Sequence, residues 1–399
     1  MHSSPPADPS EGDPAAAPAA AKPPLSVVGV DPERNFAGGE TQVLGLTLEF
    51  RAMGHRAELL CDPAGELWGR AQAAGVACYP LAIRNAVDLL AAAALRRRLR
   101  AGRYDVVHFH TSRAHAMAPW VRGLARAAVV TRRMDYVPNR LFARWLYGGA
   151  VDGVAAISGA VAGALERAGV PRERITVIPS GVDCAHFRPP TADERAHART
   201  ALGLGGADCA VGAVGALEPR KGCRYLVEAI AVLARATAAG GGRVAAIVAG
   251  DGSLRDALAA EIRRLGLADT VRMVGHVDDP RPILWALDIF AMPSLSEGLG
   301  VALLEAMACG LSAVAARVGG IVDAVQDGRT GVLVAPGDAN ALARAIASLG
   351  ADAGARIAMG AAARVRAVER FSMASMARRT VELYRACLQT GASAKAVGG

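Results

Sequence analysis

Two glutamates, Glu297 and Glu305, carry the strongest chemical signal in the sequence. They stand eight positions apart, at the two ends of the stretch Glu-Gly-Leu-Gly-Val-Ala-Leu-Leu-Glu, which follows a predicted strand at Ile289–Met292. Glu305 falls in an otherwise apolar turn, where a carboxylate is costly unless it finds hydrogen-bond donors, and ribose hydroxyls would supply them. A structural interpretation is equally open: Glu297 favours the dipole at a helix N-terminus, and Glu305 is an exposed helix residue.

The glycines between the two glutamates favour a ligand site. Gly298 and Gly300 would let a ligand approach the main chain closely. A helix predicted to start near Leu299 would present free backbone N–H groups, which together form a site for an anion. Glu305 would then lie about two turns inside that helix. The segment therefore predicts a loop and a helix N-terminus that receive an anionic ligand.

The elements that must position these residues alternate between short apolar runs and helical stretches, which is typical of βαβ units around a parallel sheet. With 399 residues, the chain exceeds what one hydrophobic core usually supports. We predict an α/β protein of two doubly wound, Rossmann-like domains, with ligands bound at the carboxyl ends of the strands in the cleft between them. The predicted strands are Leu25–Val30, Arg56–Cys61, Asp105–His110, Ala128–Thr131, Gly153–Ile157, Ile175–Pro179, Cys209–Gly215, Val244–Gly250, Val271–Val274, Ile289–Met292, Ser312–Ala315 and Gly331–Val334.

The predicted helices lie between these strands, and a helical remainder follows the last of them. We expect a break in that remainder near Phe371 and Ser372. Residues 1–24 are rich in Pro, Ala and Ser and lack a basic start followed by an apolar stretch, so they indicate a disordered tail and not a signal peptide. The predicted helices include Glu40–Met53, Val87–Ala101, Ala114–Arg126, Gly159–Ala168, Arg224–Ala236, Leu254–Leu265, Leu299–Ala308 and Asn340–Leu349.

The cysteines and the apolar runs exclude several classes of protein. The seven cysteines are scattered and include no Cys-x-x-Cys pair, so a disulfide framework or a zinc site is not expected. No apolar run reaches the length of a membrane span without a charge. We therefore expect a cytoplasmic protein.

The positive charge is concentrated in residues 84–144, which contain thirteen Arg against Asp88, Asp105 and Asp135. Nucleic acid is not an expected partner, because no aromatic interleaving or binding motif accompanies the charge. An anionic membrane surface or an anionic acceptor fits the cluster better, and would place the protein at the inner face of the cytoplasmic membrane. A solvated helix face in an Arg-rich protein explains it equally well.

The segment around the two glutamates resembles the signature of glycosyltransferase family 4, in which two glutamates eight positions apart follow Pro-Ser-x-x-Glu-Gly-Phe-Gly. The resemblance extends from about residue 25 to residue 390, and its motifs come in the family's order. These motifs are Gly38-Gly39-Glu40, Asp105–His110 (Asp-Val-Val-His-Phe-His), Ile178–Asp183 (Ile-Pro-Ser-Gly-Val-Asp), Gly215–Gly222 (Gly-Ala-Leu-Glu-Pro-Arg-Lys-Gly), Ala249–Gly252, Gly319-Gly320 and Asp327–Gly331.

The resemblance implies the GT-B fold and a retaining transfer of sugar from a nucleoside-diphosphate donor to a glycan or lipid-linked acceptor. Residues 25–184 would bind the acceptor, 185–366 would bind the nucleotide sugar, and 367–390 would form a helix that packs back on the first domain. Family habit and the basic first domain favour an acceptor in cell-envelope polysaccharide or lipopolysaccharide synthesis.

The resemblance also implies roles for individual residues. Lys221 would bind the donor diphosphate, Glu305 the ribose and Glu297 the hydroxyls of the donor sugar. Gly39 would let the β-phosphate approach the backbone, and His110 would face the sugar from the end of its strand. Catalytic roles fall on His110, Glu297 and Lys221. The residues implied in donor binding are Gly39, Arg220, Lys221, Glu297, Gly298, Leu299, Gly300, Val301 and Glu305.

The sequence departs from the family pattern at Ala216 and at Leu299. Ala216 stands where the family often has an arginine, and Arg220, beside Lys221, would replace that charge if its side chain faces the same way. Leu299 replaces the usual Phe. The segment after the strand at Ala128–Thr131 carries Arg133 and Asp135, which are candidate acceptor contacts.

No Asp-x-Asp triplet occurs in the chain. Metal-dependent sugar transferases of the other main fold hold a divalent cation with such a triplet, so we expect neither a metal nor another cofactor, with the nucleotide sugar as substrate. Lys221 and helix N-termini would stabilise the leaving diphosphate. The alternatives are a nucleotide-sugar epimerase of the same architecture and a non-catalytic nucleotide-sugar-binding protein.

Overall fold

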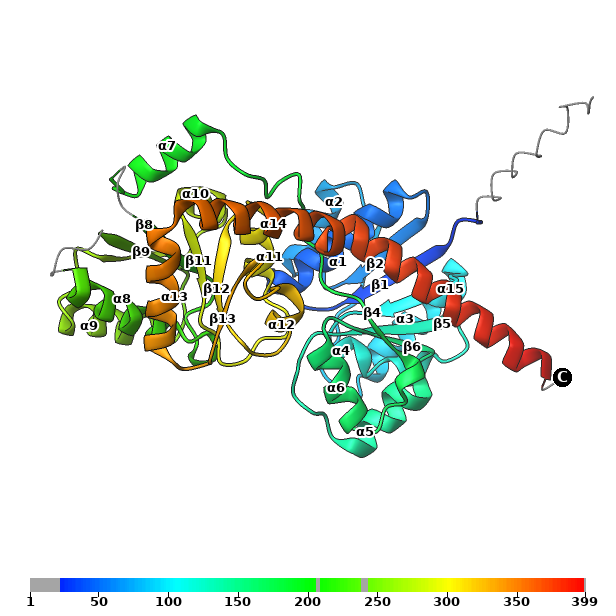
Figure 1. The fold of residues 1–399 in the computed structure, drawn as a ribbon. Coiled ribbons are helices and arrows are strands. Elements are labelled where there is room, and N and C mark those ends of the chain that lie inside the picture. The colour runs from blue at the N-terminus through cyan, green and yellow to red at the C-terminus, as the bar shows by residue number, and fades with distance from the viewer. Residues whose placement is uncertain (1–21, 206–208, 238–242, 398–399) are drawn as a thin grey trace, which may run out of the picture.

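The computed structural model describes residues 22–205, 209–237 and 243–397. Two α/β domains lie side by side, and a long C-terminal helical segment runs along both (Figure 1). The tail that the sequence predicts to be disordered, residues 1–24, lies outside the described residues except for residues 22–24.

The N-terminal domain is built on a parallel sheet in the order β3-β2-β1-β4-β5-β6-β7, seven strands within the described residues. The order reverses between β1 and β4, which both pair with their neighbours in parallel register. Small and β-branched residues fill these strands, as expected for a sheet covered on both faces. The strands are β1 (Ser26–Asp31), β2 (Arg56–Cys61), β3 (Cys78–Pro80), β4 (Val106–Phe109), β5 (Ala127–Arg132), β6 (Gly153–Ala156) and β7 (Ile175–Val177).

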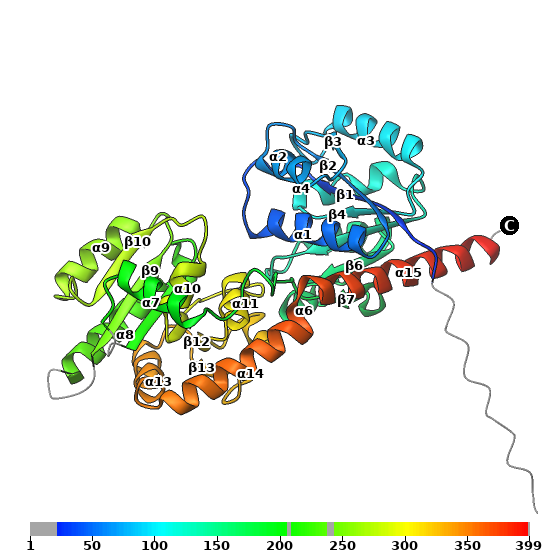
Figure 2. The ribbon, with the colours of Figure 1, turned by 90° about the horizontal axis from the view of Figure 1, so that it is seen from above.

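The two faces of this sheet have separate cores, because successive strand residues point in opposite directions. Val106 of β4 packs with α1 and α15 on one face, and Val107 packs with α3, η1 and α5 on the other. Figure 2 shows α1 and α15 on the same side of the domain. The helical segments are α1 (Gly38–Ala52), α2 (Glu66–Ala73), α3 (Leu89–Gly102), α4 (Ser112–His115), η1 (Ala118–Val121), α5 (Arg140–Trp145), its π-helical continuation η2 (Leu146–Ala150), α6 (Gly159–Arg167) and η3 (Arg172–Arg174).

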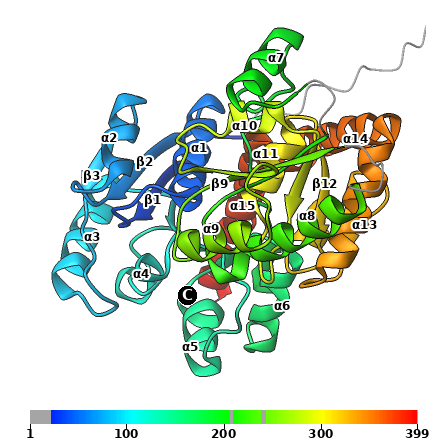
Figure 3. The ribbon, with the colours of Figure 1, turned by 90° about the vertical axis from the view of Figure 1, so that its left-hand side faces the viewer.

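The C-terminal domain repeats the same plan around a parallel sheet in the order β10-β9-β8-β11-β12-β13, six strands within the described residues. Its order reverses between β8 and β11, and Figure 3 views the molecule from this side. The strands are β8 (Cys209–Val214), β9 (Val244–Ala249), β10 (Val271–Gly275), β11 (Ile289–Met292), β12 (Ser312–Ala316) and β13 (Gly331–Val334). The helical segments are α7 (Ala192–Ala201), η4 (Pro219–Lys221), α8 (Cys223–Thr237), α9 (Arg255–Arg264), α10 (Arg281–Ala286), α11 (Val301–Ala308), α12 (Ile321–Ala324), α13 (Ala339–Ala351), α14 (Ala353–Phe371) and α15 (Met373–Val397).

The chain crosses between the domains twice, and the two crossings are hydrogen-bonded to each other. Val182 donates its N–H to the carbonyl of Phe371 at 2.7 Å, and Met373 donates to the carbonyl of Val182 at 3.1 Å. Gln42 of α1 holds the first crossing through two side-chain bonds to the backbone of Gly181, at 2.7 and 2.8 Å. The predicted helix break at Phe371 and Ser372 is confirmed, and it lies at the second crossing. No helix in the described ranges is long and apolar enough to cross a membrane.

Our prediction of one helix over Ala114–Arg126 is wrong. The structure has the short helix α4, the 3-10 turn η1 and then turns, before β5 begins at Ala127. Pro119 lies within η1 and Gly123 has a φ of +77°. Proline removes a helical N–H, and a residue with positive φ cannot continue a right-handed helix. The apolar residues of this segment are therefore spaced by their burial in the core and not by the period of a helix.

Candidate active site

The candidate site lies where the strand order of each sheet reverses, which is where ligands of open α/β sheets bind. The reversals fall between β1 and β4 in one sheet and between β8 and β11 in the other. The loops after β8 and β11 carry Lys221 and Glu297, and β4 leads directly into His110. Topology therefore places the three residues implied in catalysis at the two reversals.

Glu297 receives both cations of the loop that follows β8. Lys221 Nζ lies 2.6 Å from Glu297 Oε2, and Arg220 Nη1 lies 3.8 Å from the same oxygen. Ser294 Oγ is 3.5 Å away. The Lys221 side chain is 17% exposed and that of Arg220 is 54% exposed. Both side chains therefore face one carboxylate. The Lys221 side chain is the more buried of the two, and the Arg220 side chain is mostly in solvent.

Arg220 and Lys221 can share a direction because they lie beyond the strand. β8 ends at Val214, and both residues belong to the 3-10 turn η4. The turn closes at Gly222, which has a φ of +65° and approaches the carbonyl of Pro293 so closely that an added Cβ would lie 2.1 Å from the oxygen. Strand alternation does not apply in such a turn, and the required glycine holds the two cations against the loop after β11.

The Gly319–Gly320 pair supports Glu297 through the backbone. Gly320 donates its N–H to the carbonyl of Glu297 at 3.0 Å. A Cβ on Gly319, which has a φ of +48°, would lie 1.9 Å from the same carbonyl oxygen. Gly298 is equally confined, because its Cβ would lie 2.5 Å from the carbonyl oxygen of Arg133 in the other domain. These glycines let three backbone segments meet at Glu297.

The helix after this loop begins later than we predicted. It starts at Val301 and not near Leu299, so Glu305 lies about one turn inside and not two. The reason is Gly300, whose φ of +89° ends the loop in a left-handed conformation. Leu299 is 1% exposed and packs in the core. Val301 lines the cavity described next.

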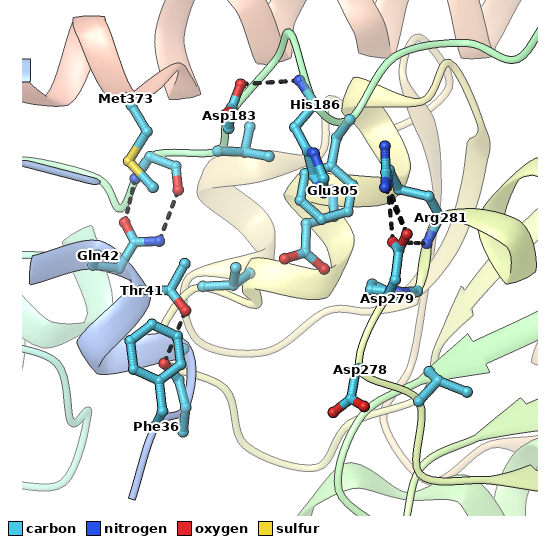
Figure 4. Close-up of a pocket in the computed structure, with 18 of the residues that line it drawn as sticks. Phe36, Thr41, Gln42, Asp183, His186, Asp278, Asp279, Arg281, Glu305 and Met373 are labelled. Atoms are coloured by element: carbon cyan, nitrogen blue, oxygen red, sulfur yellow. Dashed lines mark hydrogen bonds and ion pairs between the residues drawn. The ribbon is translucent and has the colours of Figure 1, made fainter. Parts of the chain in front are cut away.

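Glu305 faces a cavity of about 730 Å³ between the domains (Figure 4). Within the described part of the chain, no hydrogen bond or ion pair reaches its side chain, and burial raises the pKa of the carboxyl to about 7. The side chain is partly buried and opens to the cavity, and hydroxyl groups of a ligand would supply the donors that this carboxylate lacks. Of the two interpretations of Glu305, the structure favours a carboxylate that lines a cavity over one that is exposed on the helix surface.

Four chain segments build most of the walls of this cavity, and Arg70 of α2 and Met373 of α15 add one side chain each. The start of α1 contributes Gly38 and Gln42, and the first crossing contributes Asp183 and His186. The loop after β10, residues 276–281, and α11 complete it. The residues from the crossing and from the loop after β10 were not among the site residues predicted from the sequence. The rule that ligands lie beyond strand ends, applied to the strand at Val271–Val274, would have found the latter.

The glycine loop before α1 reaches the cavity one residue earlier than the predicted contact. Ala37 and Gly38 line the cavity, and Gly39 is not among its lining residues. A Cβ on Gly38 would lie 4.0 Å from Val301 Cγ2, and one on Gly39 would meet no atom within 4 Å. The role of Gly39 at a phosphate therefore stays a prediction.

His110 is enclosed at the β1/β4 reversal with one ring nitrogen free. It is 5% exposed, and its Nδ1 has no hydrogen-bond partner in the described structure. Burial lowers the pKa of His110 well below its ordinary value, so the ring is neutral at pH 7. The ring of His108 lies 4.0 Å away, on the same face of the strand.

His108, in contrast, is held at both nitrogens. Its Nδ1 lies 2.6 Å from the hydroxyl of Tyr384 on α15, and its Nε2 lies 2.7 Å from the hydroxyl of Thr131. A ring with two buried hydroxyl partners is structurally satisfied. The two histidines thus differ in their partners, and the catalytic role of His110 stays a prediction.

The two candidate acceptor residues lie where the domains touch. Asp135 Oδ2 accepts a hydrogen bond from Ser296 Oγ at 2.9 Å. Burial lowers the pKa of Arg133, and the carboxylates of Asp31 and Glu40 act against that shift. Asp31 was not singled out from the sequence: it is 1% exposed, its Oδ2 lacks a partner, and burial raises its pKa to about 7. Its place at the end of the first strand was the available signal.

Two family models match the chain and together cover most of it. The model described as Glycosyltransferase Family 4 matches residues 36–186, and the model described as Glycosyl transferases group 1 matches residues 208–352. The first match covers the N-terminal sheet except β1, and the second covers the C-terminal sheet.

Curated relatives resemble part of the chain. D-inositol 3-phosphate glycosyltransferase 2 of Catenulispora acidiphila is 39% identical over 218 residues, which are 53% of this chain and 50% of that protein. D-inositol 3-phosphate glycosyltransferase of Segniliparus rotundus is 38% identical over 224 residues, 56% of this chain and 49% of that protein. The chain spans about half the length of the curated relatives it matches.

Solved structures match almost the whole fold. Anabaena Alr3699/HepE in complex with UDP has a TM-score of 0.80 at 24% identity, over 91% of this chain and 100% of that one. A glycosyltransferase from Rickettsia africae has a TM-score of 0.81 at 20% identity, over 92% and 99%. The likeness confirms the predicted GT-B fold. With its two family matches and this architecture, the chain belongs to glycosyltransferase family 4.

Proposed function

We propose that the protein is a retaining glycosyltransferase that moves a sugar from a nucleoside-diphosphate donor to a hydroxyl of an acceptor. The observation that carries the proposal is the Lys221–Glu297 ion pair, held in one loop-and-helix unit with Glu305. Glu305 faces the cavity between the domains without a partner among the described residues. The cation of Lys221 matches a diphosphate, the carboxylate of Glu297 matches sugar hydroxyls, and the unpaired carboxylate of Glu305 matches ribose hydroxyls.

In this proposal the bound donor replaces interactions that the site residues make with one another. Lys221 turns from Glu297 to the diphosphate, and the freed Glu297 accepts hydrogen bonds from sugar hydroxyls. Glu305 accepts from the ribose hydroxyls. Arg220, which is mostly exposed, adds a second charge near the diphosphate. These groups are in place before the reaction, so they stabilise the leaving diphosphate without reorganising at that moment.

The transfer itself needs few protein groups. The bond between the anomeric carbon and the phosphate oxygen breaks, and the acceptor oxygen forms a bond on the same face. The acceptor proton passes to the departing phosphate oxygen, so no side chain acts as the base. His110, neutral and with its Nδ1 free, hydrogen-bonds the donor sugar and holds it in place.

A uridine nucleotide is the first donor to test. Anabaena Alr3699/HepE, which shares the fold, has been crystallised with UDP and with UDP-glucose. We propose UDP-glucose as the reference donor, with GDP-sugars as the comparison. The loop after β10 lines the cavity and is the expected contact of the base.

The proposed acceptor carries negative charge. The matched relatives are named D-inositol 3-phosphate glycosyltransferases, which makes an inositol phosphate one acceptor to try. The basic first domain also fits an anionic lipid-linked glycan, and we propose a role in cell-envelope polysaccharide or lipopolysaccharide synthesis at the inner face of the cytoplasmic membrane. Arg133 and Asp135, beside the domain contact, are the proposed acceptor residues.

The test is to incubate the protein with UDP-glucose and follow the products with and without acceptors. Release of UDP and a new glycoside with the donor's anomeric configuration would support the proposal. An isomeric nucleotide sugar would show an epimerase. Donor binding without turnover, across inositol phosphates and lipid-linked acceptors, would show a binding protein. Glu305→Gln serves as the control, because it keeps the size of the side chain and removes its charge.

A further inference from the structure

One surface of the N-terminal domain exposes large apolar side chains in a short stretch of chain. It is formed by the loop after β5 and by helix α5 (Arg140–Trp145), and we call it the α5 surface. Leu141 is 82% exposed and Trp145 is 56% exposed. The apolar members of the α5 surface are Met134, Tyr136, Val137, Leu141, Phe142 and Trp145.

Helix α5 turns most of its side chains outward. Its buried residue is Ala143, and the chain is held against the domain by Leu146 and Tyr147 of the following η2. Leu141 and Trp145, four residues apart, lie next to each other on the outer side of the helix. The α5 surface is thus apolar on the side that faces away from the domain core, opposite to the usual arrangement of a helix on a globular protein.

Arginines accompany this apolar row. Arg140 and Arg144, also four residues apart, are exposed beside it. The acid of the segment, Asp135, is already engaged by Ser296. Exposed Leu, Phe, Trp and Tyr with adjacent arginines are typical of helices that lie in the interface of a lipid bilayer, where rings sit at headgroup level and guanidinium groups meet anionic headgroups.

The α5 surface lies close to the contact between the domains. Asp135, within the same loop, is bonded to Ser296 of the loop that carries Glu297. The carbonyl of Arg133 packs against Gly298. The loop of the α5 surface thus reaches the domain contact at the proposed acceptor residues, whereas helix α5 lies further out on the N-terminal domain (Figure 1).

We propose that the α5 surface docks the protein on an anionic lipid membrane, with Leu141 and Trp145 inserted in the interface and Arg140 and Arg144 on the headgroups. The docking itself needs no donor and no turnover; only its purpose, delivery of a lipid-linked acceptor, rests on the proposed function. The net charge of +8 adds a longer-range attraction to acidic lipid.

The experiment is vesicle sedimentation of the full chain, without nucleotide sugar, on phosphatidylcholine vesicles with and without phosphatidylglycerol. We expect binding that needs the acidic lipid and weakens as salt rises. Leu141→Ser with Trp145→Ser should weaken binding about tenfold or more, and so should Arg140→Gln with Arg144→Gln. The matched control is Ile357→Ser with Val365→Ser, since these residues of α14 are also exposed, at 73% and 55%.

Fluorescence locates the contact independently. Brominated lipid should quench the tryptophan emission of the wild type, and Trp145→Phe should remove most of that quenching. Equal binding to neutral vesicles, or no binding at low salt, would overturn the proposal. So would an equal loss in the Ile357 and Val365 control. A concentration-dependent dimer that Leu141→Ser abolishes, without vesicle binding, would assign the surface to a second copy instead.

The proposal and the proposed function fail in different assays. If docking is right and the function wrong, vesicle binding follows the pattern above and no glycoside forms. If the function is right and docking wrong, the Leu141 and Trp145 variants transfer sugar to both soluble and vesicle-borne acceptors at wild-type rates. Folding of each variant is checked by its thermal transition, because these side chains are exposed and their loss should leave it unchanged.

Discussion

The two strand-order reversals share a topology and differ in chemistry. The β8/β11 reversal is charged: Lys221 and Arg220 face Glu297, and glycines bring the backbones of two further loops to it. At the β1/β4 reversal the two histidines are buried and neutral, Asp31 is buried with a pKa raised to about 7, and Arg133 brings a positive charge close to all three. The same fold thus holds a cluster of charged side chains at one reversal and buried, hydrogen-bonding side chains at the other.

The difference follows from which elements supply the side chains. At β8/β11 they come from loops beyond the strands, where glycines free the backbone and cations reach solvent. At β1/β4 they come from the strand end itself, covered by α1 and α15. A charged side chain on a loop can change its partner from another side chain to a bound ligand. At a buried strand end, a charged side chain costs a large desolvation free energy, so neutral groups are favoured there.

The charged reversal should be the more sensitive of the two. Lys221→Met removes the cation proposed to meet the diphosphate, and we expect kcat/KM to fall about a hundredfold, the usual cost of losing one preorganised group at a developing charge. Steady-state kinetics and donor titration measure it. Arg224→Met on α8, an exposed cation paired with Glu228, is the control. An unchanged rate would make Lys221 only a structural partner of Glu297.

Glu305→Gln tests the unsatisfied carboxylate, and we expect transfer to fall at least about tenfold as a charge-assisted bond to the ribose is lost. A pH series separates this role from a structural one. The pKa of the folded carboxyl is about 7, above 4.5, so the folded state keeps a proton that the unfolded state has released. Wild-type stability should therefore fall as pH rises from about 4.5 to about 7, and Glu305→Gln should flatten that fall. Equal pH dependence in the two proteins would contradict the buried, unpaired carboxylate.

Tyr384→Phe tests the histidine pair at the β1/β4 reversal. It leaves Nδ1 of the buried His108 without its partner, and we expect a loss of about 1–3 kcal/mol in the free energy of unfolding. Because the His108 ring packs against His110, which is proposed to hold the donor sugar, kcat/KM should fall as well. Tyr79→Phe, on β3, is the control. A loss of stability with an unchanged kcat/KM would show that His108 has a structural role only.

Arg220→Ala should have a smaller effect, because its side chain is 54% exposed and 3.8 Å from Glu297. Exposed ion pairs contribute about 0–1 kcal/mol, so we expect donor affinity to weaken up to about fivefold. Ala216→Arg, at an exposed position where the family often has the cation, should tighten binding. Donor titration of both variants decides whether Arg220 replaces the missing charge, and a silent Arg220→Ala would exclude it.

Chelation should have the smallest effect. If Lys221 and helix N-termini stabilise the leaving diphosphate, turnover should continue in excess EDTA at the rate seen without it. Rates are compared before and after dialysis, with magnesium or manganese added back to one arm. Complete loss of activity in EDTA, restored by either metal, would refute the proposed mechanism. It would mean that the side chains at the β8/β11 reversal need a metal ion to stabilise the diphosphate.

The periodicity of the sequence was enough to predict two α/β halves, because alternation of two and of 3.6 residues is a local property. The resemblance to glycosyltransferase family 4 was what predicted Lys221 and Glu297 in one donor site, and the structure brings the two side chains to 2.6 Å. Local pattern failed where backbone breakers override it, as in the segment with Pro119, which forms turns instead of a helix. It also failed by two residues at α11, where Gly300 delays the helix.

Only the tertiary structure decided which side chains have partners. Tyr384 is 276 residues from His108, and Asp135 is 161 residues from Ser296, yet each pair is hydrogen-bonded. The sequence also gives no sign of three further features. These are the unpaired Nδ1 of His110, the unpaired carboxylate of Glu305 and the outward apolar row of α5. A residue's type and spacing set what it can do, but burial and partners are fixed by packing between distant segments, and these determine whether a polar group is already satisfied or open to a ligand.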